Sequence, residues 1–299
     1  MAMHPGQIHV DERTVRRLIH DQFPQWRGMS VEAMQAAGTV NAIFRIGPDL
    51  AARFPLLDQE PPEAWRWLTA EAAAAREFAE AATVPTTEPV ALGAPGHGYP
   101  MPWSIQTWLP GNDATVEDPE GSTEFAHDLA ALITSLRAAD THGRRFAGHG
   151  RGGHLPDHDQ WLERCFQQSE SLLDVPLMRE IWADLRRLPA IDADAMCHGD
   201  LTPPNVLVGG GRLVGVLDGG AFGPADPALD LVAAWHLLGE QQREWLRFAV
   251  GCSDIQWRRG MAWAFQQAMG LVWYYVDSNP TMARWGLRSL NRLVRAGGV

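Results

Sequence analysis

The segment of residues 198–218 constrains the fold more than any other part of the chain. Two short β-like runs, NVLV and RLVGVLD, flank the triple glycine 209–211, and such a pattern predicts a β-hairpin. Asp200 lies before the first run, Asn205 begins that run, and Asp218 ends the second. A hairpin returns the chain to its starting point, so we expect the three side chains to share one cleft.

Short β-like runs also dominate the early part of the chain. The runs VEAMQ, NAIFRI and LAARF, within residues 31–54, are separated by turn residues and predict a three-strand meander. Helical spacing of apolar residues predicts a helix over 11–23, capped by Asp11, and an alanine-rich composition predicts another over 62–82. Segment 96–111 is expected to form a hairpin that ends in a strand and a Pro-Gly break.

After Gly111 the sequence becomes mainly helical. Helices are expected over 122–140, 159–173, 226–239, 254–277 and 280–296. The chain is therefore predicted to be an α+β protein with a β-rich N-terminal lobe, residues 1–108, and a helical C-terminal lobe, residues 109–299. The hinge would lie near 107–111.

Charge and composition limit the function. All 25 basic residues are Arg, and the net charge is −11, which opposes nucleic-acid binding and favours a cationic ligand. A general bias towards acidic surfaces would give the same balance. No apolar run is long enough for a bilayer, and no secretory signal is visible, so a cytoplasmic protein without membrane contact is expected. The three cysteines are far apart and suggest neither disulfides nor zinc.

The residue types around the hairpin suit phosphoryl transfer. That reaction needs a carboxylate to orient the attacking hydroxyl and oxygen ligands for Mg²⁺. In HGDLTPPN, Asn205 follows Asp200 by five residues, which is the spacing of the protein-kinase catalytic loop, and Asp218 ends the next apolar run. Gly-Gly follows Asp218, so the Phe of a protein-kinase DFG motif is missing. His198 is expected to support the loop structurally.

The block CHGDLTPPNVLVGGGRLVGVLDGGAFGPADPALDLVAAW resembles the aminoglycoside phosphotransferases and related macrolide and small-metabolite kinases. The runs NAIFRIG, LAARFP and YPMPWSIQTWLPG extend the resemblance over essentially the whole chain. It implies a protein-kinase-like bilobal fold, with ATP or GTP as the phosphate donor and nucleotide bound by the first lobe. It also implies that Asp200 is the catalytic residue, that Asn205 and Asp218 bind Mg²⁺, and that Asp226 and Asp230 tether the catalytic loop.

Nucleotide-binding residues are expected in the N-terminal lobe. A kinase of this shape needs a cation on its third strand, and because the chain has no Lys, Arg53 is the candidate. The layout of the resembling family selects Glu71 as its ion-pair partner. Thr39 lies in the turn where a phosphate-covering loop belongs. In the resembling fold the hinge backbone pairs with adenine, which points to the Thr107 carbonyl and the Leu109 N–H.

The acceptor is predicted to be a small hydroxylated molecule, and an aminoglycoside is the first choice by resemblance and charge. Five aromatic residues could form an acceptor wall for a macrolide or could pack the core: Trp257, Trp263, Trp273, Tyr274 and Tyr275. An amino alcohol or sugar would be a housekeeping acceptor. A pseudokinase is a further alternative, because Arg53 replaces Lys and the phosphate loop is poor. The Gly-, His- and Arg-rich loop 142–158 lacks metal-ligand spacing and is expected to be solvated.

Overall fold

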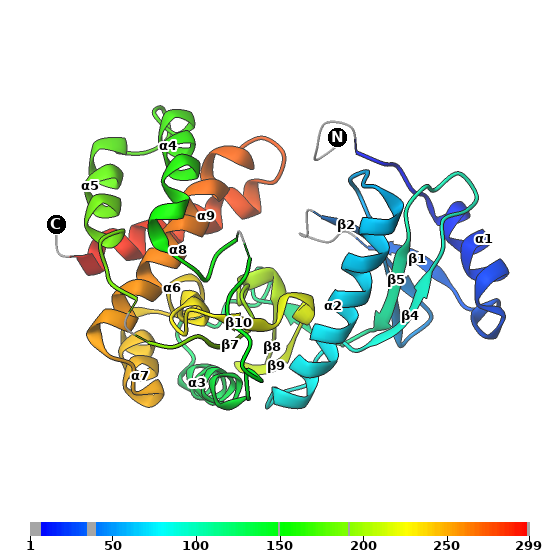
Figure 1. Ribbon diagram of the computed structural model, residues 1–299, viewed down its shortest axis with the longest axis horizontal. Helices are drawn as coiled ribbons and strands as arrows, with labels where there is room; N and C mark the ends of the chain where they lie inside the picture. The colour runs from blue at the N-terminus through cyan, green and yellow to red at the C-terminus, as the bar shows by residue number, and fades with distance from the viewer. Residues whose placement is uncertain (1–6, 35–39, 149, 191, 298–299) are drawn as a thin grey trace. The chain divides into compact units, whose positions relative to one another are not determined.

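The computed structural model describes residues 7–34, 40–148, 150–190 and 192–297 (Figure 1). The chain divides into two compact units. The N-terminal unit comprises residues 1–80, 85–110 and 217–221, and the C-terminal unit comprises residues 81–84, 111–216 and 222–299. The N-terminal unit therefore includes Asp218 and its Gly-Gly, which the sequence-based lobe boundaries place in the other lobe.

The N-terminal unit contains a five-stranded antiparallel sheet with the order β1-β2-β3-β5-β4. Its strands are β1 (Val31–Met34), β2 (Asn41–Ile46), β3 (Leu50–Pro55), β4 (Pro89–Gly93) and β5 (Trp103–Thr107). The first three confirm the predicted meander. The hairpin predicted within 96–111 is wrong, because β5 pairs with the earlier strand β4. Within 96–111, Gly96 and Tyr99 form a single bridge in the turn between β4 and β5. β4 lies at the sheet edge and begins with Pro, which is tolerated there but is rare in strands, so the sequence does not indicate a strand at this position.

Two helices accompany the sheet, α1 (Glu12–Gln22) and α2 (Pro61–Ala81). Asp11 caps α1 by accepting a hydrogen bond from Thr14 N at 2.8 Å, as predicted. Strand side chains alternate between faces. Phe54 of β3 therefore joins a core with Leu18 of α1, whereas its neighbour Arg53 lines a small cavity with residues of α2. The period of two thus places one cation of β3 against α2.

The C-terminal unit contains two small sheets. Strands β6 (Asn112–Asp113), β8 (Val206–Gly209) and β9 (Arg212–Val216) form one, and β7 (Ala195–Cys197) pairs with β10 (Gly223–Ala225) in the other. The β8–β9 pairing confirms the predicted hairpin. β7 was not predicted because it has only three residues, and Asp200 follows this strand by three positions.

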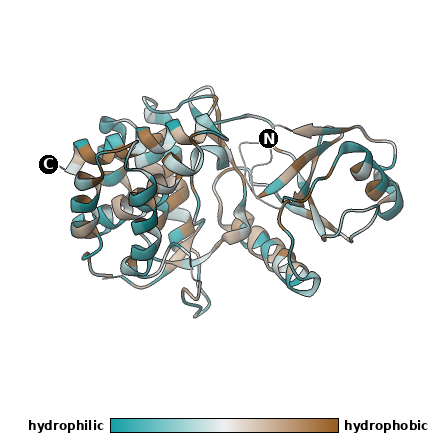
Figure 2. Cartoon of the chain, turned by 90° about the horizontal axis from the view of Figure 1, so that it is seen from above, coloured by the Kyte–Doolittle hydropathy of each residue, from teal (hydrophilic) through white to brown (hydrophobic). Residues whose placement is uncertain are grey.

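Seven α-helices are found in the described part of this unit: α3 (Thr123–Ala138), α4 (Asp159–Gln168), α5 (Val175–Leu185), α6 (Val232–Leu237), α7 (Glu240–Val250), α8 (Asp254–Tyr274) and α9 (Pro280–Gly297). α5 and α7 were not predicted, and the helix expected over 226–239 is reduced to α6 after a 3₁₀ turn. Polar and apolar residues alternate along the helices (Figure 2). No described helix combines the length and the apolar character that crossing a membrane requires.

α8 is the central helix of the C-terminal unit. Fourteen of its 21 residues are buried, and it packs against α4, α5, α6 and α9. A helix buried on most sides needs apolar residues around its circumference. Trp257, Trp263 and Tyr275 are accordingly buried, whereas Tyr274 is exposed. The core interpretation therefore holds for these three aromatic residues.

Candidate active site

The loop that carries Asp200 is fixed at its start by Asp230. The Asp230 carboxylate is 1% exposed and accepts hydrogen bonds from His198 N at 2.8 Å and Gly199 N at 2.9 Å. Gly199 has a φ of 85°, a conformation that costs a side-chain-bearing residue energy. Burial raises the pKa of Asp230, and the two amides and His198 oppose that effect. A buried carboxylate so paired holds the loop backbone in one conformation.

His198 and Asn205 fix the rest of the loop. The fully buried His198 accepts a hydrogen bond at Nδ1 from Asp200 N at 3.2 Å. Asn205 Nδ2 donates to Asp200 O at 3.0 Å and to Asp200 Oδ2 at 2.9 Å. No described residue donates to Asn205 Oδ1, and an amide oxygen is a suitable ligand for Mg²⁺. The donor chemistry of Asn205 therefore fits the metal role implied for it.

The Asp200 carboxylate is oriented from two further directions. Its Oδ1 accepts hydrogen bonds from Arg151 Nη2 at 2.9 Å and from Gln267 Nε2 at 3.1 Å. The side chain remains 38% exposed. A carboxylate that is held in place yet reachable from solvent can accept a hydrogen bond from a substrate hydroxyl.

Gln267 continues into a buried hydrogen-bonded chain. The next member is His236, whose Nε2 lies 2.8 Å from Gln267 Oε1. Its other ring nitrogen, Nδ1, lies 2.8 Å from Ser289 Oγ. Because the Asp200 carboxylate only accepts, the Gln267 amide must donate to it and present its oxygen to His236. His236 Nε2 then carries the proton and Nδ1 accepts from Ser289. Burial lowers the pKa of His236 to about 3, which keeps the ring neutral.

The Asp226 side chain binds residues of α8. Its Oδ2 accepts hydrogen bonds from Arg259 Nε at 2.8 Å and Trp263 Nε1 at 2.7 Å, both on α8. Its Oδ1 accepts from Ala228 N at 3.0 Å. Asp226 and Arg259 are both buried, and therefore form a buried ion pair that anchors the segment after β10 to α8. Of the two predicted tethers, Asp230 contacts the catalytic loop directly and Asp226 contacts α8.

In the N-terminal unit, Asp218 forms an ion pair with Arg53. Arg53 Nη2 donates to Asp218 Oδ1 at 2.8 Å, and the Asp218 side chain is 43% exposed. Asp218 has a φ of 60°, which is uncommon for a residue other than Gly and is a form of backbone strain often found at functional sites. The carboxylate is thus placed in the part of the chain that also holds the candidate phosphate-binding cation.

The glycines after Asp218 are explained by α2. A Cβ on Gly219 would lie 2.4 Å from Phe78 Cδ1, and a Cβ on Gly220 would lie 3.1 Å from Glu71 Cβ. Phe78 is fully buried and cannot move aside. The missing Phe of a DFG-like motif therefore reflects a close approach between α2 and this turn.

Glu71 lines the same small cavity as Arg53 and Gly220, but no ion pair with Arg53 is found among the described residues. Arg53 is paired with Asp218 instead. Burial raises the pKa of Glu71 to about 7, with Arg53 opposing the shift and Asp218 adding to it. At neutral pH Glu71 is thus divided between its neutral and charged forms.

The remaining nucleotide-side predictions concern backbone groups. Thr107 ends β5, and its N–H donates to Glu88 O at 2.9 Å. Trp108 N donates to Asp49 O at 2.7 Å, and Leu109 follows outside the strand. Thr39 lies outside the described residues.

Sequence reasoning missed three residues around Asp200. Arg151 belongs to the loop that was expected to be solvated. Gln267 and His236 stand within apolar helical runs, MAWAFQQAMG and LVAAWHLL. A polar residue on a helix face that must be buried needs a partner, and this was the available signal. The sequence could not identify the partner, which lies 67 residues away in the case of Gln267 and Asp200.

Comparison with known proteins identifies the family. The model of the phosphotransferase enzyme family matches residues 36–261, which include Arg53, Asp200, Asn205 and Asp218. The chain belongs to this phosphotransferase family. The resemblance noted in the sequence is thereby confirmed.

Two curated phosphotransferases are similar to parts of the chain. Aminoglycoside 3'-phosphotransferase of Escherichia coli is 29% identical over 84 residues, which cover 26% of this chain and 31% of the relative. Viomycin phosphotransferase of Streptomyces vinaceus is 32% identical over 165 residues, which cover 50% of this chain and 54% of the relative. The matched segments therefore span about a third and about half of these relatives.

A solved structure shares the fold over most of the phosphotransferase chain. The GDP and kanamycin complex of APH(2'')-IIIa is 19% identical and has a TM-score of 0.70, with 94% of this chain and 98% of that chain covered. At this identity the likeness concerns the fold. It confirms the predicted α+β class with a protein-kinase-like arrangement of a β-rich N-terminal region and a helical C-terminal region.

Proposed function

We propose that the chain is an ATP- or GTP-dependent O-phosphotransferase that acts on a hydroxyl group of a small molecule. The observation that carries the proposal is the hydrogen-bonded pair of Asp200 and Asn205, 2.9 Å apart, in a loop held by Asp230. This arrangement supplies one carboxylate for a hydroxyl and one amide oxygen for a cation. Family membership supports the same reaction.

In the proposed mechanism the main contributions are positioning and charge stabilisation. Asp200 accepts a hydrogen bond from the acceptor hydroxyl, orients it for in-line attack on the γ-phosphoryl group and takes its proton late. Arg53 binds the α- and β-phosphates, for which a guanidinium offers two parallel donors. When Arg53 binds phosphate, Asp218 is freed from its ion pair.

Mg²⁺ is the metal that this chemistry requires, and Asn205 and Asp218 would hold it. Their donor set fits, since Mg²⁺ is usually bound by one or two protein oxygens together with phosphate and water oxygens. The metal would neutralise charge on the β- and γ-phosphates. A nucleotide donor agrees with the GDP present in the solved APH(2'')-IIIa complex.

The proposal is tested with Asp200→Asn. We expect turnover to fall by roughly 10³-fold or more, because the neutral amide cannot accept the hydroxyl proton, while nucleotide binding stays near the wild-type value. Phosphorylated product is measured by mass spectrometry and nucleotide affinity by calorimetry. Asp157→Asn, which changes an exposed carboxylate of the same unit, is the control. Near-normal turnover in Asp200→Asn would exclude this assignment.

A pseudokinase would behave differently in the same assays. It would bind nucleotide but show no Mg²⁺-dependent nucleotide hydrolysis and no product with any acceptor. The presence of Asp200, Asn205 and Asp218 together argues for the active enzyme, since all three functional groups are retained.

We propose an aminoglycoside as the acceptor. The net charge of −11 favours a cationic molecule, and both the 3'-phosphotransferase relative and the kanamycin complex belong to enzymes named for aminoglycosides. Viomycin is the second candidate because the viomycin phosphotransferase match covers the longer part of this chain. Macrolides and small metabolites such as amino alcohols or sugars remain in the screen.

The acceptor is tested by incubating the protein with ATP or GTP, Mg²⁺ and each compound. The expected result is a mass gain of one phosphate on an aminoglycoside. A product from viomycin or a macrolide alone would replace the acceptor assignment and leave the phosphotransferase proposal intact.

A further inference from the structure

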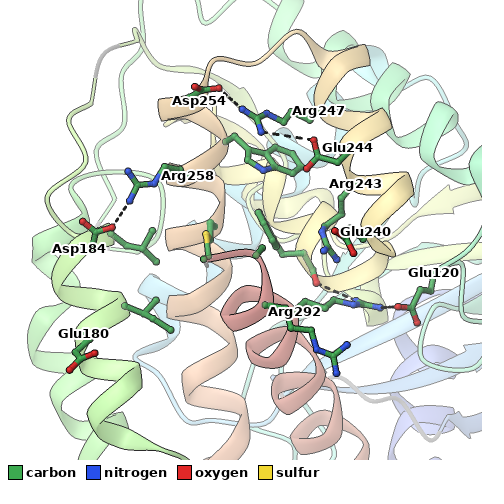
Figure 3. Close-up of a pocket in the computed structure, with 18 residues that line it drawn as sticks. Glu120, Glu180, Asp184, Glu240, Arg243, Glu244, Arg247, Asp254, Arg258 and Arg292 are labelled. Carbon is green, nitrogen blue, oxygen red and sulfur yellow. Dashed lines mark hydrogen bonds and ion pairs between the residues drawn. The ribbon is translucent and has the colours of Figure 1, made fainter. Parts of the chain in front are cut away.

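A second cavity lies entirely within the C-terminal unit. It has a volume of about 790 Å³ and is lined by residues of α5, α6, α7, α8 and α9 (Figure 3). Neither Asp200 nor the residues that bind its carboxylate line it. Along α8 the lining ends at Met261, six residues or about 9 Å before Gln267, which contacts Asp200. The cavity is therefore separate from the candidate active site.

Most charged groups around the cavity are already neutralised. Arg258 pairs with Asp184, and Arg247 pairs with Asp254 (Figure 3). These pairs are substantially exposed to solvent. They form a polar rim and give no reason to expect a ligand of either charge.

Two deeply buried arginines differ from that rim. Arg243 and Arg292 are each 7% exposed, and both line the cavity. Arg292 Nη2 lies 2.9 Å from Glu120 Oε1, but the angle does not suit a hydrogen bond, so the contact is an ion pair. No described carboxylate lies within ion-pair distance of Arg243. Figure 3 shows Arg243, Arg292 and Glu120 on the same side of the pocket. Arg292 is thus ion-paired, whereas Arg243 has the carboxylates of Glu240 and Glu244 near it without forming an ion pair with either among the described residues.

The protein backbone holds both guanidinium groups in place. Arg243 Nη1 donates to Leu238 O at 3.0 Å, and Arg292 Nη1 donates to His236 O at 2.8 Å. These bonds satisfy the carbonyls at the end of α6 and use one nitrogen of each guanidinium. A guanidinium has five N–H groups, so capping α6 does not account for the remaining donors.

The buried indole N–H of Trp235 also lacks a hydrogen-bond acceptor among the described residues. Trp235 lines the cavity and is 2% exposed. Arg243 lies over its ring, 5.0 Å from the ring centroid. Leaving such a donor unpaired is costly, and native structures usually provide a partner for it.

Electrostatics around Arg243 act in both directions. Burial lowers the pKa of Arg243 and the neighbouring charge of Arg292 lowers it further, whereas the carboxylates of Glu240, Glu244 and Glu120 raise it. An anion beside both guanidiniums would relieve the repulsion between Arg243 and Arg292 and accept from the indole N–H.

We propose that this cavity binds a small organic anion through one carboxylate or phosphoryl group, recognised by Arg243, Arg292 and Trp235. The volume of the cavity leaves room for an organic body next to Met261 and Trp257, which also line it. This site is independent of the proposed phosphotransferase activity.

Calorimetry with the full chain tests the proposal, with sodium phosphate and sodium acetate as probes at matched ionic strength. We expect saturable binding of at least one probe at millimolar concentration. Arg243→Met keeps an apolar contact with Trp235 and removes the charge, so its dissociation constant should rise at least tenfold. Trp235→Phe keeps an aromatic, though smaller, ring and removes the N–H, and should weaken binding several-fold. Arg258→Met, on the rim, should bind as the wild type does.

Inorganic phosphate could also bind near Arg53, so the titration is repeated with Arg53→Met. Retained binding in Arg53→Met together with its loss in Arg243→Met supports the new site. Loss in Arg53→Met with retention in Arg243→Met overturns it, as does the absence of saturable binding of both probes to the wild type. If Arg243→Met does not fold, unchanged binding in Trp235→Phe overturns the proposal. Acetate binding without phosphate binding identifies a carboxylate ligand, and the reverse identifies a phosphoryl ligand.

Discussion

The two units hold their functional side chains in different ways. In the C-terminal unit, Asp200 is fixed by Arg151, Gln267 and Asn205, and the loop behind it is bound to the buried Asp230. In the N-terminal unit, Arg53 and Asp218 form one partly exposed ion pair beside Glu71, whose pKa of about 7 leaves it between two charge states. Asp200, the residue proposed to orient the hydroxyl, is therefore rigidly positioned, and the charged residues proposed for nucleotide and metal can change partners.

The largest effect on stability is expected from the buried support of the C-terminal unit. Asp226→Asn should lower the free energy of unfolding by about 3–5 kcal/mol, because it leaves the buried Arg259 without its counter-charge. Chemical denaturation measures the change. Asp184→Asn, which breaks the exposed pair with Arg258, should cost about 1 kcal/mol or less. Equal effects of the two substitutions would remove the distinction between buried and exposed pairs.

The next effect concerns the N-terminal unit. Arg53→Met should weaken nucleotide binding by about ten- to hundredfold, because it removes the cation proposed for the phosphates. Arg53→Lys should recover part of the loss, since a point charge replaces two parallel donors. Calorimetric titration with ATP and GTP measures both variants. Unchanged nucleotide affinity in Arg53→Met would show that the Arg53–Asp218 pair has a structural role only.

A smaller effect is expected from the buried chain behind Asp200. Gln267→Met should lower kcat by about tenfold and leave the nucleotide KM unchanged, because the carboxylate loses one positioning hydrogen bond. The adjacent Gln266 contacts His158 and not Asp200, so Gln266→Met is a matched control. An equal decrease of kcat in both variants would indicate general damage to α8 instead.

The smallest effect is a pH dependence of stability caused by Glu71. Its folded pKa of about 7 lies above the ordinary value of 4.5, so the folded state favours the neutral acid. The resulting stabilisation is complete below about pH 4.5 and is lost as the pH rises to about 7. Glu71→Gln should remove this dependence and be more stable than the wild type by about 1–2 kcal/mol at pH 8, since partial exposure screens the full shift.

Urea denaturation at pH 5 and pH 8 tests this expectation. The substituted and wild-type proteins should differ mainly at the higher pH. An equal difference at both values would contradict the elevated pKa. Glu63→Gln, an exposed residue on the same helix, should show no pH-dependent difference from the wild type.

Several features of the fold follow from local sequence. The meander, α1 with its Asp11 cap, and the β8–β9 hairpin are encoded by periodicity and turn residues that lie within each segment. α5 and α7, with 11 residues each, were missed although both are amphipathic, and β7 has only three residues, too few for a periodic pattern to be seen. β7 forms because β10, 26 residues further along, supplies its pairing partner, which no local pattern reveals.

The sequence alone determined the chemical identity of the candidate site. The spacing of Asp200, Asn205 and Asp218 and the absence of Lys selected phosphoryl transfer with an arginine on β3, because these depend on residue type and local order. Only the tertiary structure decided the partners: Arg53 with Asp218, Asp200 with Gln267, and Asp226 with α8. Those contacts join residues 33 to 165 positions apart, and burial and packing choose among many polar groups that the sequence leaves equivalent.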